Sequence, residues 1–310
     1  MPRTVEIFPI IKGRALLIGK KTGFGKGKIV GPGGKVEPGE TSRYAAKREL
    51  EEETGLSCSA RSLEYGGRIL FISGKDCVEN DYFLSGKNSG KPAETREAVP
   101  KLFPIDALPT ERMWEDSKHW VPRAVSGEGV SGTFVYSPGW KKLVSWELME
   151  GARLGTLVFL RRGGKILLIR KKRGIGEGLY NGPGGRVEEG ETPEEGASRE
   201  LKEEVGVVSR AEDLREMATL DFFFGKGKPF MRVFAYFSEK FSGNPLETEE
   251  AEPVWFDEKG IPYGEMWADD KVWLPKVLSG KRVYGRFVFD KSGKRLLEKK
   301  LVILSPEFYR

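Results

Sequence analysis

The chain of 310 residues contains no glutamine, one histidine (His119) and two cysteines (Cys58 and Cys77). A single histidine argues against a zinc site and against Ser-His-Asp chemistry. The two cysteines lack the spacing of a metal site and do not indicate a disulfide framework. Lysine, arginine and glutamate are abundant where glutamine is missing, a bias common in heat-adapted proteins.

Long hydrophobic runs are also missing. The longest apolar stretches, such as residues 155–160, are far too short to span a bilayer. Residues 1–4 do not begin an apolar signal region. We therefore expect a soluble, cytoplasmic protein that does not contact membranes.

The composition indicates folded domains with a basic surface. Hydrophobic residues make up 38% of the chain, and its length is enough for two domains of about 150 residues each. The net charge of +6 suits an anionic partner. Because the basic residues are scattered and not interleaved with aromatic residues, we do not expect nucleic acid to be that partner.

One stretch of the sequence occurs twice. Residues 185–207 read G-R-V-E-E-G-E-T-P-E-E-G-A-S-R-E-L-K-E-E-V-G-V, and the same frame occupies residues 34–56. Every fixed position recurs at an offset of 151 residues, as with Gly34 and Gly185. An internal repeat of this length indicates two domains of one type rather than a solenoid.

Each copy predicts a helix with three carboxylates on one face. Glu200, Glu203 and Glu204 stand at positions i, i+3 and i+4. Like charges repel unless a cation lies among them, and carboxylate oxygens suit Mg²⁺ or Mn²⁺. The first copy has the same cluster in Glu49, Glu52 and Glu53.

The ends of these helices carry recognisable signals. Thr192 and Thr41 are expected N-caps, with acidic residues in the first turn, and Gly206 and Gly55 are expected to end the helices.

Arginine and glycine residues accompany each carboxylate cluster. Arg199 and Arg48 are expected to hold Glu191 and Glu40 through two parallel hydrogen bonds. The glycine-rich residues 182–185 allow bare backbone to approach a metal ion and a phosphate. A solvated surface helix is the alternative, and the second copy of the frame argues against it.

Apolar segments on either side of each frame predict a sheet. Strands are expected in the first copy at residues 5–10, 14–18, 65–71, 81–84, 101–105, 132–136 and 142–146, with a second helix at 114–124. In the second copy they are expected at residues 157–160, 165–170, 222–224, 232–237, 254–256, 282–289 and 296–304, with a helix at 267–278. This order favours an α/β sandwich with mixed sheets in each of two domains, residues 1–150 and 151–310.

The duplicated frame resembles the Nudix box, G-x5-E-x7-R-E-U-x-E-E-x-G-U with U apolar, and both copies match every fixed position. The resemblance implies two tandem Nudix α/β/α sandwich domains that hydrolyse a nucleoside diphosphate linked to another group, with Mg²⁺ or Mn²⁺ as cofactor. It implies catalytic roles for Glu203, Glu204 and Arg199 in the second copy and for Glu52, Glu53 and Arg48 in the first.

Residues 156–304 resemble one branch of this family, the mammalian-type relatives of MutT that hydrolyse oxidised purine nucleoside triphosphates such as 8-oxo-dGTP. The motifs that carry this resemblance are Lys171-Lys172-Arg173-Gly174, Tyr180-Asn181-Gly182, Ile261-Pro262, Met266-Trp267-x-Asp269-Asp270, Trp273, Pro275, Tyr284-Gly285 and Phe287. The implied activity releases a nucleoside monophosphate and pyrophosphate, which cleans the nucleotide pool and prevents DNA damage.

The resemblance also implies site residues. The metal ligands fall on Gly184, Glu200, Glu203, Glu204 and Glu250, and in the first copy on Gly33, Glu49, Glu52, Glu53 and Glu97. The substrate pocket falls on Thr156, Lys171, Asn181, Trp267, Asp269 and Asp270, with Phe222 and Phe224 as further walls, and in the first copy on Lys20, Phe24, Trp114 and Asp116.

These pocket residues suit a purine. An indole such as Trp267 stacks on a base, and Asn181 offers a donor and an acceptor. Adjacent carboxyl groups near apolar walls repel, so one of Asp269 and Asp270 is expected to hold a proton. The alternatives are that one aspartate only caps the following helix, or that Trp267 belongs to the core.

The first copy departs from the branch in its pocket. Val30 stands in place of Asn181, and Ser117 in place of Asp270. Because its carboxylates are intact, we expect the first domain to hydrolyse a different or broader set of nucleotides; a mainly structural role is the alternative.

Other functions remain open. ADP-ribose, NADH, nucleotide sugars and dinucleoside polyphosphates are alternative substrates for the same box. A nucleotide-binding scaffold without turnover is disfavoured for the second domain by its complete set of carboxylates. We expect a monomer with its tandem domains packed together, because two fused copies can replace a homodimer.

Overall fold

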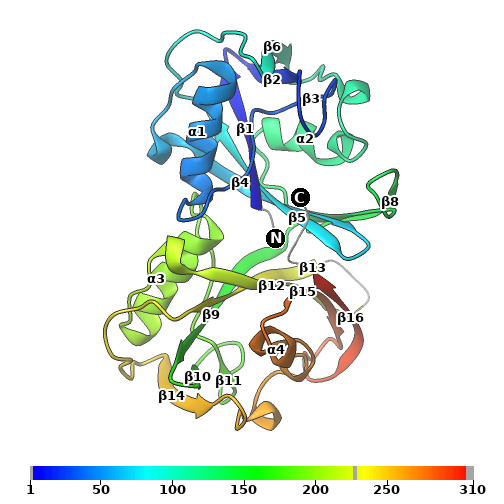
Figure 1. Cartoon of the computed structure of the whole chain (residues 1–310). Helices are drawn as coiled ribbons and strands as arrows, with labels where there is room; N and C mark the ends of the chain where they lie inside the picture. The colour runs from blue at the N-terminus through cyan, green and yellow to red at the C-terminus, as the bar shows by residue number, and fades with distance from the viewer. Residues whose placement is uncertain (1–2, 226–228, 305–310) are drawn as a thin grey trace. The chain divides into compact units, whose positions relative to one another are not determined.

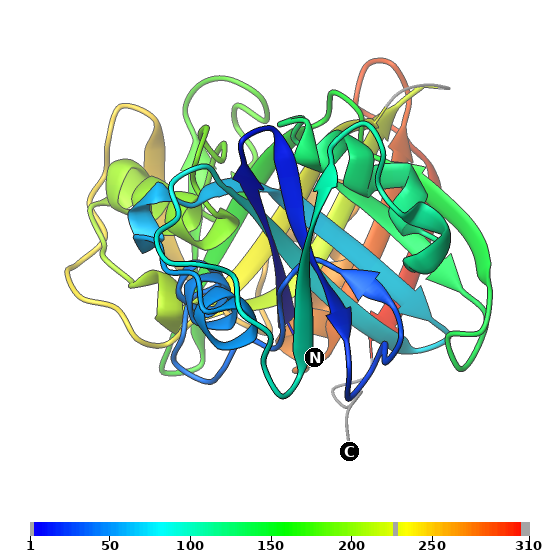
Figure 2. The same cartoon turned by 90° about the horizontal axis from the view of Figure 1, so that it is seen from above.

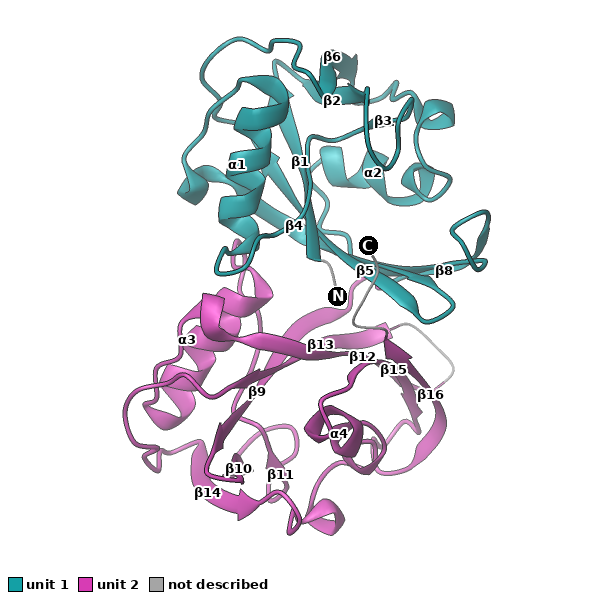
Figure 3. Cartoon of the chain, in the orientation of Figure 1, with its two compact units in different colours: residues 1–148, 307–310 teal, residues 149–306 magenta. Residues whose placement is uncertain are grey.

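The computed structural model describes residues 3–225 and 229–304. These residues divide into two compact units, with the boundary between Leu148 and Met149 (Figure 3). We call the segment before the boundary unit 1 and the segment after it unit 2. The boundary predicted from the sequence, between residues 150 and 151, lies close to it.

The described part of unit 1 consists of eight strands and two α-helices. The strands are β1 (Arg3–Ile11), β2 (Arg14–Lys20), β3 (Ile29–Val30), β4 (Glu64–Ser73), β5 (Asp76–Ser85), β6 (Ala98–Pro104), β7 (Gly132–Tyr136) and β8 (Leu143–Leu148). The helices are α1 (Ser42–Thr54) and α2 (Ser117–Val125), with short 3-10 turns at Ala60–Ser62 and Thr110–Arg112.

The described part of unit 2 repeats this order. Its strands are β9 (Arg153–Arg162), β10 (Lys165–Lys171), β11 (Tyr180–Asn181), β12 (Arg215–Phe224), β13 (Pro229–Ser238), β14 (Ala251–Asp257), β15 (Arg282–Phe289) and β16 (Leu296–Leu304). Its helices are α3 (Pro193–Val205) and α4 (Asp270–Leu278), with 3-10 turns at Ala211–Asp213 and Tyr263–Glu265.

Both units have the same strand order. In unit 1 it is β3-β2-β1-β5-β4-β7-β8, with β6 beside β2, and unit 2 follows the identical order with β14 beside β10. Strand β1 pairs with β5 in parallel and with β2 in antiparallel orientation. Figure 2 shows β1 and β2 side by side in dark blue. The predicted α/β architecture with mixed sheets is confirmed.

The helices of each unit lie on opposite faces of its sheet (Figure 1). Successive residues of a strand point to opposite faces, so Ile7 of β1 packs with Leu50 of α1, and Phe8 packs with Trp120 of α2. In unit 2, Val158 packs with Leu201 of α3, while Phe159 packs with Trp273 of α4. Each fully buried side chain of this kind contributes about 1.5–3 kcal/mol to folding.

Several details differ from the sequence predictions. Strands β12 and β5 begin at Arg215 and Asp76, well before the predicted strands at residues 222–224 and 81–84. Helices α2 and α4 begin at Ser117 and Asp270, three residues after the tryptophans at which the predicted helices start. The two-residue strands β3 and β11 were not predicted, because so short a run has no periodicity. No described helix is long and apolar enough to cross a membrane.

Candidate active site

Helix α3 begins and ends at the predicted residues. The hydroxyl oxygen of Thr192 accepts a hydrogen bond from the Glu195 N–H at 3.3 Å, and the Glu195 carboxylate accepts one from the Thr192 N–H at 2.8 Å. Gly206 ends the helix with a φ of 70°. Helix α1 is likewise capped by Thr41 and Gly55, but no acidic residue lies in its first turn, so that detail of the prediction is wrong for α1.

The packing of α3 aims its carboxylates at the glycine-rich loop. Leu201 is fully buried against the sheet, while Glu200 and Glu204, on either side of it in the sequence, face the loop. A Cβ atom on Gly185 would lie 2.5 Å from the Glu200 carboxyl carbon. The side chains of Glu204, Glu200 and Glu203 are 5%, 16% and 58% exposed, respectively, so the cluster runs from the interior to solvent.

Arg199 connects the frame. Its guanidinium donates to Glu191 from Nε at 2.8 Å and from Nη2 at 3.0 Å, which is the predicted pair of parallel bonds. Its Nη1 donates to Glu200 at 3.0 Å and to Glu203 at 2.8 Å, and Nη2 also donates to the carbonyl oxygen of Arg186 at 2.8 Å. One side chain therefore fixes three carboxylates and the loop.

Glu204 is held from two sides. Its Oε2 accepts a hydrogen bond from the Gly184 N–H at 2.7 Å, and its Oε1 pairs with Lys171 Nζ at 3.3 Å. Burial raises the pKa of Glu204, while Lys171 and the Gly184 N–H oppose that shift. Burial also raises the pKa of Glu200, against the effect of Arg199. Both groups are therefore poised to accept protons more readily than exposed glutamates.

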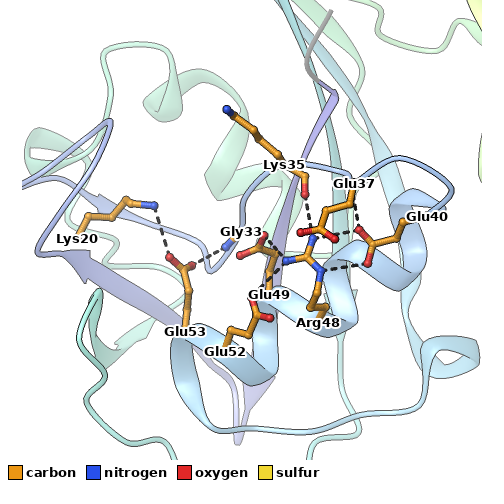
Figure 4. A network of polar contacts seen from close by, with 9 residues as sticks. All are labelled: Lys20, Gly33, Lys35, Glu37, Glu40, Arg48, Glu49, Glu52 and Glu53. Atoms are coloured by element: carbon orange, nitrogen blue, oxygen red, sulfur yellow. Dashed lines mark hydrogen bonds and ion pairs between the residues drawn. The ribbon is translucent and has the colours of Figure 1, made fainter. Parts of the chain in front are cut away.

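Unit 1 contains the same network (Figure 4). Arg48 donates to Glu40 at 3.1 and 3.0 Å, to Glu49 at 2.8 Å and to Glu52 at 3.2 Å. Glu53 accepts from the Gly33 N–H at 2.8 Å and pairs with Lys20 Nζ at 3.4 Å. Burial raises the pKa of Glu49 and of Glu53.

The fifth predicted metal ligand of each unit lies on a loop. Glu250 lines the unit 2 cavity and forms an ion pair with Arg173. Glu97 of unit 1 is exposed, and its carbonyl oxygen accepts a hydrogen bond from the Lys21 N–H at 2.8 Å. Unit 1 has Thr22 at the position of Arg173, so an ion pair of this kind is not available there.

The donor set fits a hard divalent cation. Within residues 3–225 and 229–304, no three Asp, Glu, His or Cys side chains are grouped as a metal site, and the cations of Arg199 and Lys171 bind the carboxylates instead. The donors are all oxygens, which Mg²⁺ prefers. A Cβ on Gly184 would lie 2.0 Å from the carbonyl oxygen of Thr156, so only glycine lets the backbone approach here. The metal assignment stays a prediction.

A cavity of about 520 Å³ in unit 2 adjoins this network. All eight predicted substrate-binding residues of unit 2 line it: Thr156, Lys171, Asn181, Phe222, Phe224, Trp267, Asp269 and Asp270. Gly184 and Glu250 line it as well, which brings the pocket and the glutamate network together. Trp267 lies at the cavity and meets Phe289 edge-on, with ring centroids 6.3 Å apart, and is not part of the buried core.

Asp269 and Asp270 are both buried in the cavity wall. Asp269 accepts a hydrogen bond from the Trp273 indole at 3.0 Å, and Asp270 accepts one from the Trp267 N–H at 3.0 Å. Burial raises the pKa of Asp269 to about 6. Burial and the charge of Asp269 raise the pKa of Asp270 well above its usual value. Asp269 occupies the N-cap position of α4 without a side-chain capping bond, so capping does not account for it.

Unit 1 has a corresponding cavity of about 440 Å³. The predicted residues Lys20, Phe24, Trp114 and Asp116 line it, and Phe24 stacks on Trp114 with ring centroids 5.0 Å apart. Asp116 accepts hydrogen bonds from the Trp120 indole at 2.8 Å and from the Tyr136 hydroxyl at 2.5 Å. Burial raises the pKa of Asp116.

Sequence reasoning missed several residues of these cavities. Phe289, Phe230 and Met231 line the cavity of unit 2, and Glu6, Asn80 and Tyr136 line that of unit 1. Glu6 gave a signal, because it interrupts an otherwise apolar predicted strand at residues 5–10.

The comparison with protein families matches both units. The family model described as NUDIX domain matches residues 2–124 and 151–277. The chain belongs to the Nudix hydrolase family. Each matched segment contains one complete Nudix box, with its helix and its glycine-rich loop.

Two curated Nudix relatives are similar to about half of the chain. The oxidized purine nucleoside triphosphate hydrolase of Danio rerio is 41% identical over 141 residues, which are 46% of this chain and 89% of the relative. The protein of the same name from Mus musculus is 40% identical, with the same coverage of both chains. The solved structure of the Mutator MutT protein from Bacillus halodurans has a TM-score of 0.42 at 24% identity, covering 48% of this chain and 97% of that one.

Proposed function

We propose that unit 2 hydrolyses purine nucleoside triphosphates, preferably oxidised ones such as 8-oxo-dGTP, to the nucleoside monophosphate and pyrophosphate. The observation that carries the proposal is the cavity lined by Trp267, Asn181 and the Asp269-Asp270 pair beside the glutamates of α3. The names of the relatives from Danio rerio and Mus musculus support the same substrate class.

The base would bind by stacking and by hydrogen bonds. The indole of Trp267 offers an aromatic face at the cavity wall. The Asn181 side chain is fixed through its Oδ1, which accepts from the Gly182 N–H at 2.9 Å. Because burial favours the protonated form of Asp269 and Asp270, the pair would share a proton and both donate to and accept from the purine edge.

A divalent ion, Mg²⁺ or Mn²⁺, would be held by the Gly184 carbonyl and by Glu200, Glu203 and Glu204, with Glu250 added from its loop. When bound, it supplies positive charge that neutralises the phosphates and makes water more acidic. Glu204 would deprotonate the attacking water, because it is buried and its pKa is raised, and a base whose pKa approaches the working pH is more effective.

The reaction then breaks one phosphoanhydride bond. The water oxygen forms a bond to the second phosphorus from the sugar, and Glu204 takes the water's proton. At the same time the bond breaks between this phosphorus and the oxygen that links it to the first phosphorus. The nucleoside monophosphate leaves with the bridging oxygen. Lys171, 3.3 Å from Glu204, is placed to stabilise charge on the phosphate chain. Arg199 positions Glu200 and Glu203.

For unit 1 we propose the same reaction on a nucleotide whose base is bound by a different set of side chains. Its Arg48 network and its Glu53, Gly33 and Lys20 contacts repeat those of unit 2. The walls of its cavity differ in the residues that would meet the base.

A substrate panel tests the proposal. The full chain carrying Glu53→Gln, which removes the proposed base of unit 1, is assayed for kcat/KM on 8-oxo-dGTP, 2-oxo-dATP, dGTP, ADP-ribose and NADH. We expect 8-oxo-dGTP to lead the ranking. Asn181→Ala should reduce the preference for 8-oxo-dGTP over dGTP about tenfold, the value of one hydrogen bond, while Asn244→Ala, in an exposed loop, should not. A ranking led by ADP-ribose or NADH would refute the substrate, and an unchanged ranking in Asn181→Ala would refute the pocket.

A further inference from the structure

Polar and apolar side chains stand at different wall positions in the two cavities. Strand register aligns them: Val30 lies opposite Ile18 as Asn181 lies opposite Ile169. Unit 1 is therefore apolar where unit 2 has the amide of Asn181. At other wall positions the reverse holds: unit 1 has a polar residue where unit 2 has an apolar residue at the corresponding position.

Three such positions can be paired. Val5 and Thr156 bond to equivalent glycines, Gly34 and Gly185, so the next residues, Glu6 and Leu157, correspond. In the strand pairing, Asn80 lies opposite Ile69 in unit 1, and Val233 lies opposite Leu220 in unit 2, so Asn80 and Val233 correspond. Tyr136 lies opposite Ser73 in unit 1, and Phe289 lies opposite Phe224 in unit 2, so Tyr136 and Phe289 correspond.

Glu6 is held in the wall of the cavity by a short chain of hydrogen bonds. Its Oε1 accepts from the Gly31 N–H at 2.7 Å, and its Oε2 accepts from Asn80 Nδ2 at 3.4 Å. Asn80 in turn accepts from the Thr4 hydroxyl at 2.9 Å. Burial raises the pKa of Glu6 to about 7, so the carboxylate is costly to keep there. A cavity without a ligand would gain stability from an apolar side chain such as the Leu157 of unit 2.

We propose that unit 1 is a second nucleotide site in which Glu6 reads a guanine-type base through two adjacent N–H donors. Burial alone favours the protonated form of Glu6, but two N–H donors from a ligand would stabilise the ionised form, and an ionised carboxylate only accepts hydrogen bonds. Each Glu6 oxygen accepts one described bond from the chain and has a second lone pair for a ligand. Guanine offers N1–H and its amino group side by side. Adenine and cytosine offer a donor beside an acceptor, and uracil one donor between two acceptors, so none of these satisfies both oxygens.

Aromatic side chains complete the site. Trp114 and Phe24 both line the cavity, with their ring centroids 5.0 Å apart, and give it an aromatic lining suited to a base. The inference rests on the proposed function only in treating this cavity as a nucleotide pocket. It does not require turnover in either unit.

Binding without a metal ion separates this inference from hydrolysis. The full chain carrying Asn181→Ala and Trp267→Ala, which impair the pocket of unit 2, is titrated calorimetrically with GMP, AMP, CMP and UMP. We expect GMP to bind most tightly. Glu6→Gln should weaken GMP binding at least ~10-fold and narrow the ratio of GMP to AMP affinity, because the amide presents an N–H to a donor. Asn80→Ala, which releases Glu6, should act in the same direction.

Each other outcome counts against the inference. If no nucleotide binds, or if GMP binds no more tightly than the other three, the site is not a guanine pocket. If Glu6→Gln weakens all four equally, Glu6 has only a structural role. Glu6→Leu introduces the residue that unit 2 has at this position, and its Tm shows whether the variant is folded. A folded Glu6→Leu variant that keeps the preference for GMP would overturn the assignment. Loss of 8-oxo-dGTP hydrolysis in unit 2 would leave these results unaffected.

Discussion

Arg199 binds Glu191 through two parallel hydrogen bonds, Nε to Oε1 at 2.8 Å and Nη2 to Oε2 at 3.0 Å. This pair joins the loop before α3 to the helix and leaves Nη1 to reach Glu200 and Glu203. Planar, bidentate contacts of this kind restrict orientation more than a lysine could. The position of the glutamates therefore depends on a residue that need not touch the substrate.

Replacing Arg199 with lysine tests that role. Arg199→Lys keeps the charge but loses the parallel bonds, so the carboxylates of Glu200 and Glu203 should no longer be held in their present positions. We expect kcat for 8-oxo-dGTP to fall at least ~10-fold, because small misplacements of reacting groups are costly, while KM stays within about threefold since the base pocket is intact. The matched variant Arg210→Lys, at an exposed ion pair with Asp213, should leave both constants unchanged. A rise in KM alone would contradict the positioning role.

Gly184 is expected to tolerate no side chain. Its φ is 155°, and a Cβ would lie 2.0 Å from the Thr156 carbonyl oxygen. Gly184→Ala should therefore lower the free energy of unfolding by at least about 2 kcal/mol and displace the N–H that holds Glu204. Gly190 has a φ of 82° with no atom within 4 Å of the added Cβ, so Gly190→Ala should cost only about 1 kcal/mol. Urea unfolding of both variants measures the difference; equal losses would argue against the close approach.

The buried aspartates predict a pH dependence of stability. Burial raises the pKa of Asp269 from its usual value of 3.8 to about 6 in the folded protein. The folded state then holds more protons than the unfolded state between these values, so the stabilisation present below pH 4 is lost as the pH rises through about 6. Asp269→Asn keeps an acceptor for the Trp273 indole but does not titrate. Relative to wild type it should gain up to about 3 kcal/mol between pH 4 and 8.

Urea unfolding of wild type and Asp269→Asn at several pH values checks this. A difference in unfolding free energy that does not change with pH would show that the carboxyl group is not perturbed in the fold.

Local signals in the sequence were enough for helices α1 and α3 and for the glutamate network. Thr192 and Gly206 define the ends of α3 because capping is a local interaction. The contact of Arg199 with Glu191 was predictable because both lie within one short motif. The apolar segments were enough to place most of the strands, including the one in which Ile7 and Phe8 point to opposite faces, but the order of the strands in the sheet was not predicted.

Contacts between distant strands could not be predicted in this way. Glu6 and Asn80 are brought together only by the parallel pairing of β1 with β5. The start of α4 was missed because the Asp270 carboxylate binds the Trp267 N–H and turns the chain before the helix begins. Such contacts depend on strand register and on side-chain direction, which the spacing of motifs does not encode.

The most direct test of the account is the release of pyrophosphate from 8-oxo-dGTP by the full chain carrying Glu53→Gln. We predict release with Mg²⁺ or Mn²⁺, none after the ions are chelated, and a fall in kcat of at least ~100-fold in Glu204→Gln, as expected for the loss of an acid–base group. Cleavage at nearly the unmutated rate in Glu204→Gln, or no cleavage of this or any related phosphoanhydride with either ion present, would contradict the account.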